Sequence, residues 1–117
     1  MNKHQRATVQ NIIYRLTELA DGLAGEAYKP TFATAYGIMD SAHEDFEDMS
    51  NEEQDKYDNM PEALQDGEKG EALQSAAEAL QSAADYLENL PEVEYQGWDE
   101  DCIHAIAAAV ETAEQVL

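Results

Sequence analysis

Residues 71–84 consist of two identical heptapeptides, EALQSAA and EALQSAA, and the chain continues as DYLENLP. One column of this repeat is leucine and the other is mostly alanine, namely Leu73, Leu80 and Leu87, and Ala76, Ala83 and Leu90. Apolar residues that recur every seven positions form one face of a helix that packs against another helix. Two to three heptads are too few to establish a free-standing coiled coil, and an antiparallel pairing inside a helical bundle explains the repeat equally well. Pro91 is expected to end this helix.

The N-terminal segment has the spacing of another helix, from about Lys3 to Leu23. Its apolar residues recur at intervals of three and four and so form one stripe. The stripe contains Val9, Ile12, Ile13, Leu16, Leu19, Ala20 and Leu23. Gly22 and Gly25 lie where this helix is expected to end.

A longer helix is expected after Pro30, because proline is favoured in the first helical turn, and it should extend to about Tyr57. Its stripe is Phe32, Tyr36, Met39, Ala42 or His43, Phe46, Met49 or Ser50, Glu53 and Tyr57. Ser50 and Glu53 also match the S-x-x-E capping box, so a break and restart near Ser50 is the alternative. We favour a continuous helix because no glycine or proline lies near Ser50.

The segment after this helix, MPEALQDGEKG, is predicted to be a corner of the chain. Pro61 stops the preceding helix because the residue before a proline avoids the helical region. One short helical turn fits residues 61–65, and Gly67 and Gly70 mark the end of the corner. The side chains expected to hold the corner against the helices are Tyr57, Met60 and Leu64.

The C-terminal segment predicts a last helix that runs to the end of the chain. Trp98 is expected to anchor the loop before it, and Asp99 fits an N-cap. One face of this helix should contain Ile103, Ile106, Ala107, Val110, Ala113 and Leu117.

The composition agrees with an all-α fold, because Ala, Leu, Glu and Gln are abundant while Gly and Pro are scarce. We predict that residues 1–117 form one acidic helical domain, a four-helix antiparallel bundle-like arrangement. Alanine buries little apolar area, so the core is modest. A core of this kind is often completed by a second copy, and pairing into a homodimer stays open.

The charge is high and uneven. The chain has a formal net charge of −20, yet residues 1–30 hold four basic and three acidic side chains. Direct binding to nucleic acid or to an anionic membrane is therefore not expected, because both need Lys and Arg to neutralise phosphates. The charge favours a basic partner, or serves solubility alone.

Features of secretion are lacking. Cys102 is the single cysteine, so no intramolecular disulfide can form, and the N-terminal MNKHQRATVQ has no apolar signal region. We expect a cytoplasmic protein.

No pattern of catalytic or metal-ligating residues appears. Carboxylates used for acid–base chemistry are usually buried, whereas here they crowd a polar segment and should be hydrated. Asp101, Cys102 and His104 lie close in the sequence, but a zinc site needs three or four ligands at recognised spacings. We therefore expect no enzyme, no cofactor and no metal.

The acidic segment invites a comparison with nucleic acid. Residues 44–58 would span about 22 Å as a helix and carry eight carboxylates, or about one per 2.8 Å. DNA carries one charge per about 1.7 Å of its axis, or about 3.4 Å per strand. We expect a partner-binding surface made of Glu44, Asp45, Glu47, Asp48, Glu52, Glu53, Asp55, Asp58, Glu62, Asp66 and Glu68.

The stretch EEQDKYDNMPEALQDGEKGE, residues 52–71, resembles a block found in small acidic helical proteins of phages and prophages. Those proteins carry E-E-Q-x-x-[YF]-D-N-[ML]-P-E-x-L-Q, followed by a basic residue, Gly and Glu. The resemblance covers about residues 50–90 and implies expression inside an infected or lysogenic bacterium. It implies no activity.

Three interpretations follow. The first is a phage-encoded nucleic-acid mimic that occupies a basic groove of a host DNA- or RNA-binding defence protein. The second is a non-catalytic structural or oligomerisation module whose acidic face only keeps it hydrated. The third is an adaptor that recognises a partner helix through the Ala/Leu columns.

Overall fold

The computed structural model describes residues 1–25, 29–88 and 93–117. Its helices are α1 (Lys3–Ala24), α2 (Phe32–Asp58), α3 (Glu62–Gln65), α4 (Glu68–Glu88) and α5 (Trp98–Ala113), followed by the 3₁₀ turn η1 (Glu114–Val116). No strand occurs in these three ranges. The prediction of an all-α fold is confirmed.

The first helix begins at a reciprocal cap. The Asn2 side chain accepts a hydrogen bond from the Gln5 backbone N–H at 2.8 Å, and the Gln5 side chain accepts one from the Asn2 N–H at 3.0 Å. Both bonds satisfy donors that the first turn would otherwise leave free. The predicted stripe faces inward, with these residues fully buried: Val9, Ile12, Leu16, Leu19 and Leu23.

The second helix is continuous through Ser50, as predicted. Thr31 caps its start by accepting a hydrogen bond from the Thr34 N–H. Ser50 is buried and donates its hydroxyl to the Ala77 carbonyl of α4 at 2.7 Å, so it ties two helices together and caps neither. Ser and Thr favour caps only when their oxygen meets local backbone donors, and here it meets a neighbouring helix.

The corner between α2 and α4 contains the short helix α3, as expected at residues 61–65. The side chain that holds the corner is Gln65, whose Nε2 donates to the carbonyls of Tyr57 and Met60. The expected role of Leu64 is wrong, because its side chain is 55% exposed.

The fourth helix begins at Glu68, earlier than the predicted exit from the corner. Gly70 therefore lies inside α4, where it is buried. A Cβ at this position would meet the Gln65 carbonyl oxygen at 2.1 Å, so only glycine allows α3 to lie this close. The Ala/Leu columns face inward at Ala76, Leu80, Ala83 and Leu87. The predicted positions of Leu90 and Pro91 lie outside the described residues.

The last helix differs from the prediction at both ends. Its N-cap is Gly97, with a φ of 87°, and Asp99 lies in the first turn. Glycine adopts this left-handed backbone conformation without strain, because it has no Cβ. The Trp98 ring meets Phe32 edge-on at 5.4 Å, which confirms its role as an anchor. The buried face is Cys102, Ile106, Ala109 and Ala113. The assignments of Ala107 and Leu117 to it are wrong, because both are exposed.

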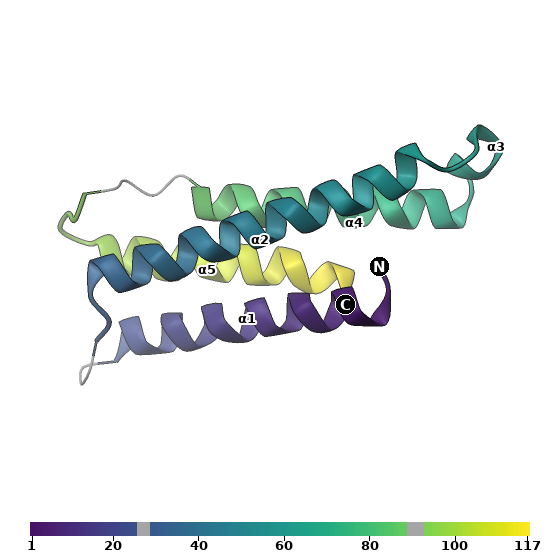
Figure 1. The fold of residues 1–117 in the computed structure, drawn as a ribbon. Helices are drawn as coiled ribbons and strands as arrows, with labels where there is room; N and C mark the ends of the chain where they lie inside the picture. The colour runs from purple at the N-terminus through teal and green to yellow at the C-terminus, as the bar shows by residue number, and fades with distance from the viewer. Residues whose placement is uncertain (26–28, 89–92) are drawn as a thin grey trace.

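The long helices pack side by side into an elongated body of 54 × 24 × 16 Å. The α2–α4 contact is the most extensive, followed by α4–α5 and α1–α5, while α1 and α2 touch less. Figure 1 shows that α2, α3 and α4 continue beyond the ends of α1 and α5. The hairpin formed by α2, α3 and α4 therefore presents its tip to solvent.

Candidate interaction surface

Nearly all of the predicted partner-binding carboxylates lie on the surface of the α2–α4 hairpin. Most belong to α2, Glu62 and Asp66 belong to α3 and its C-terminal cap, and Glu68 begins α4. We call the following residues the acidic ridge: Glu44, Asp45, Glu47, Asp48, Glu52, Asp55, Asp58, Glu62, Asp66 and Glu68. Asp45 is half-buried and the others are exposed.

Glu53 does not belong to this surface, and its prediction as an exposed partner-binding residue is wrong. Its side chain is fully buried, because the helical spacing from Phe46 places it on the inner stripe. Its Oε1 accepts a hydrogen bond from Lys56 Nζ at 3.0 Å, and its Oε2 lies 3.6 Å from the Met1 ammonium. Oε2 has no hydrogen-bond partner in the described chain. A buried carboxylate needs such cations, because an unpaired one is very costly to desolvate.

The outer face of α2 carries a column of unpaired carboxylates. Glu44, Asp48 and Asp55 project about half a helical turn away from the buried Phe46. Among the described residues, none of the three makes a hydrogen bond or an ion pair through its side chain. Asp40, which the sequence interpretation omitted, extends this column by one turn. Its spacing of four residues from Glu44 is the signal that could have found it.

The two edges of the ridge are held by neighbouring helices. On the α1 side, Asp45 pairs with Arg15 at 3.2 Å and Glu52 accepts a hydrogen bond from the Gln5 amide at 3.2 Å. On the α4 side, Glu47 lies 3.2 Å from Nε2 of His43 on α2, and Nδ1 of the same ring lies 2.8 Å from the Ala84 carbonyl of α4. The edges are therefore fixed in position, whereas the centre of the ridge stays open to solvent.

The burial of Glu53 lowers the density of surface carboxylates along α2. Without Glu53, residues 44–58 carry seven surface carboxylates over about 22 Å, or about one per 3.2 Å. This spacing is close to the value of about 3.4 Å for one strand of DNA.

The acidic residues at the C-terminal end of α2 do not favour helix stability. Asp55 and Asp58 lie in the last turn of α2, where the exposed carbonyls carry partial negative charge. The one basic residue of that turn, Lys56, is directed to Glu53 and Gln5. Two acids are thus retained where the helix dipole opposes them.

The cluster of Asp101, Cys102 and His104 does not converge on one point. Cys102 is buried in the core, and burial, with Asp101 and Asp99 nearby, raises the pKa of its thiol. His104 is exposed on α5. In the described ranges, no three His, Cys, Asp or Glu side chains are grouped so that they could hold a metal ion.

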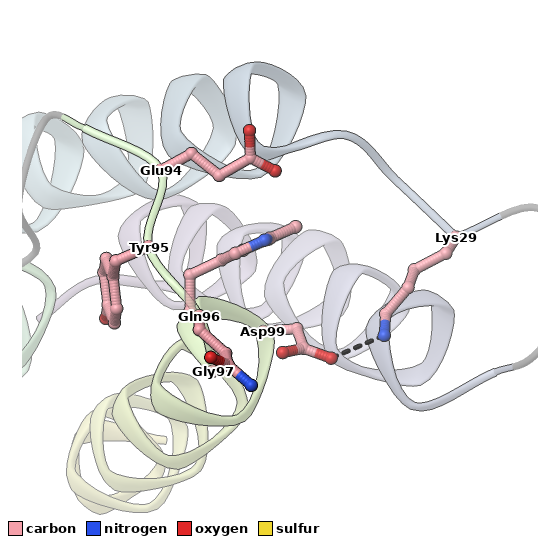
Figure 2. A pocket seen from close by; sticks show the side chains of 7 residues that line it. Lys29, Glu94, Tyr95, Gln96, Gly97 and Asp99 are labelled. Atoms are coloured by element: carbon pink, nitrogen blue, oxygen red, sulfur yellow. Dashed lines mark hydrogen bonds and ion pairs between the residues drawn. The ribbon is translucent and has the colours of Figure 1, made fainter.

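A separate pocket of about 440 Å³ lies beside the loop that leads into α5. Figure 2 shows Lys29 facing Asp99 at this pocket. The Lys29 ammonium donates a hydrogen bond of 2.5 Å to the Asp99 carboxylate. The hydrogen bond from Lys29 lowers the pKa of Asp99. Burial and a hydrogen bond to Asp101 raise the pKa of Tyr95 to about 12. The Tyr95–Asp101 hydrogen bond holds the loop against α5, and the Lys29–Asp99 pair joins the segment before α2 to α5.

Comparison with protein-family models, with curated proteins and with solved structures finds no match to this chain. The resemblance to phage proteins therefore stays a prediction. Within the described ranges, no helix combines the length and the apolar character that crossing a bilayer requires.

Proposed function

We propose that this chain is a non-catalytic nucleic-acid mimic, whose acidic ridge occupies the basic groove of a DNA- or RNA-binding protein. A phage-encoded inhibitor of a host defence protein, acting in the bacterial cytoplasm, is the specific form of the proposal. The partner would be recognised by its Lys and Arg side chains, which otherwise neutralise phosphates.

The observation that carries the proposal is the outer column of α2. Glu44, Asp48 and Asp55 stand on one continuous 27-residue helix and have no cationic partner in the described chain. A hydrated carboxylate on ordered backbone offers its charge at a defined position, as a phosphate does on a duplex. Binding would gain free energy by releasing the cations that gather around the acidic ridge, as they do around DNA, and by long-range attraction.

The packing pattern supports a four-helix antiparallel arrangement for the scaffold, with α1, α2, α4 and α5 as its helices and α3 as an appended turn. In this arrangement the Ala/Leu columns of α4 already pack against the other helices of the same chain, since Leu80, Ala83 and Leu87 are buried. An adaptor or a homodimer that used those columns would have to open the fold first.

The test compares two variants of equal charge. The ridge variant carries Glu44→Gln, Asp48→Asn and Asp55→Asn, and the control carries Glu78→Gln, Asp21→Asn and Asp85→Asn on exposed faces elsewhere. The immobilised chain should retain basic nucleic-acid-binding proteins from a bacterial lysate, and duplex DNA should release them. The ridge variant should lose this retention and the control should keep it.

Affinity for a retained protein should fall steeply with salt, because counterion release scales with the number of charges neutralised. The proposal would be contradicted if the ridge variant retained the same proteins as the unchanged chain, or if duplex DNA failed to release the retained proteins.

A further inference from the structure

A small hollow lies between α2 and α4, next to Asp40, the residue that extends the outer column. Its volume is about 200 Å³, below the range of about 300–1,000 Å³ typical of sites for whole small-molecule ligands. The described residues that line it are Tyr36, Met39, Asp40, His43, Leu87 and Glu88. Its size suits one side chain of a partner.

The floor of this hollow is apolar and its wall is aromatic. Met39 is fully buried and Leu87 is 4% exposed, so both are fixed by the core. Tyr36 forms the wall, and its ring packs at 6.1 Å from Phe32. An apolar floor accepts the methylene stem of a long side chain, and an aromatic ring attracts a cation placed over its face.

The rim of the hollow is anionic on both sides. Asp40 from α2 and Glu88 from α4 are exposed, and neither carboxylate has a hydrogen bond or an ion pair in the described chain. Because the two acids come from different helices, they flank the opening.

The histidine in the wall has no free donor for the hollow. Its Nδ1 lies 2.8 Å from the Ala84 carbonyl and its Nε2 lies 3.2 Å from the Glu47 carboxylate. Both ring nitrogens are thus occupied by acceptors. The groups that a ligand would meet at the rim are therefore carboxylate acceptors.

We propose that this hollow binds one arginine side chain of the basic partner, with the guanidinium between Asp40 and Glu88 and its stem on Met39 and Leu87. Arginine fits better than lysine because its planar fork can donate to two carboxylates at once and stack on Tyr36. The inference rests on the proposed function only for the source of the arginine. It adds a directional contact to a surface that otherwise attracts by charge density.

The first experiment measures the hollow without any partner. N-acetyl-arginine amide is titrated into the whole chain and followed by the methyl NMR signals of Met39 and Leu87. The lysine analogue and the neutral, nearly isosteric citrulline analogue serve as competing probes. We expect saturable shifts with arginine, at least threefold weaker binding of lysine and no saturable shift with citrulline.

The second experiment uses variants of the rim. Asp40→Asn with Glu88→Gln should weaken arginine binding at least tenfold, while the charge-matched control Asp21→Asn with Glu111→Gln should change it less than twofold. All four positions are exposed, so both variants should fold. Equal weakening by the control, equal binding of citrulline, or shifts that avoid Met39 and Leu87 would overturn the inference.

The outcomes separate this inference from the proposed function. One outcome is that arginine binds in the hollow while the ridge variant still retains the DNA-competed proteins. This outcome would support the arginine site and contradict the nucleic-acid mimic. Retention that is lost in the ridge variant but unchanged by the rim variant would support the mimic and contradict the hollow.

Discussion

The two faces of α2 have opposite characters although they share one backbone. The inner face is in contact with α4 and the core, and it holds Met39, Phe46, Ser50 and Glu53 without exposure to solvent beyond a few per cent. The outer face holds Glu44, Asp48 and Asp55 in water. Glu53 and Asp55 are two residues apart, yet one is enclosed by cations and the other faces solvent.

This difference shows that the net charge of the chain does not tell which carboxylates are open to a partner. A carboxylate on the inner face is neutralised by the molecule's own cations, and so it contributes to the fold. A carboxylate in the outer column costs self-repulsion, and within the described residues its side chain makes no hydrogen bond or ion pair. Only the outer face is available to a partner.

Removing the largest inner side chain should have the largest effect. Phe46→Ala should lower the free energy of unfolding by about 3–5 kcal/mol, because a fully buried ring leaves a cavity between the helices. Denaturant unfolding followed by circular dichroism measures this. Phe46→Leu should lose less than the alanine variant, because leucine fills part of the cavity, and it keeps the comparison measurable if the alanine variant does not fold. Asp48→Ala on the outer face should change stability by less than about 0.5 kcal/mol.

Neutralising the buried carboxylate should come next. Glu53→Gln should cost about 2–3 kcal/mol, since it leaves the Met1 ammonium and Lys56 without their charged partner. The same denaturation assay measures the loss, and Glu52→Gln beside it is the matched control. A cost below that of the control would mean that Glu53 is not held as an ion pair.

The hydroxyl that joins α2 to α4 should contribute less. Ser50→Ala should cost about 1 kcal/mol, because it removes one buried hydrogen bond of 2.7 Å to Ala77 and leaves the helix intact. If Ser50 instead capped a broken helix, the variant would also lose helical signal in the native state. Unchanged native ellipticity with a small drop in stability is the expected result.

The smallest effect should have the opposite sign. Asp58→Asn should raise the free energy of unfolding by about 0.3–1 kcal/mol, because it removes an acid from the negative end of the α2 dipole. Glu68→Gln, at the positive start of α4, should lower it by a similar amount. Both effects should shrink in high salt. The same sign in both variants would show that general repulsion, and not the dipole, dominates.

Much of the scaffold follows from the periodic positions of apolar residues. The stripe of α1, the continuity of α2 and the inward Ala/Leu columns were predictable, because helical spacing places those side chains on one side of each helix. The acidic ridge was predictable in outline for the same reason. The dual assignment of Glu53, both to the inner stripe and to the partner surface, could not be resolved from spacing. Lys56 lies on α2 itself, but the second cation beside Glu53 is the Met1 ammonium, which is distant in the sequence.

Other features depended on contacts between segments that are distant in the sequence or joined by a tight turn. Gly70 lies inside a helix because α3 folds back onto α4, and Gly97 caps α5 because it adopts the left-handed conformation itself. Leu117 was misassigned because α5 ends at Ala113 and a 3₁₀ turn follows it. Ala107 was misassigned because it stands in a run of three alanines, whose small side chains do not mark which side faces the core.

By itself, the sequence determined that the chain is helical and where its helices place their apolar sides, because those properties depend on local spacing and propensity. The tertiary structure alone decided which carboxylate is enclosed, which carboxylates stay open to a cation, and that Asp40 and Glu88 flank one hollow. These results depend on the arrangement of helices in space, and the burial of a charge is set by the neighbours that surround it.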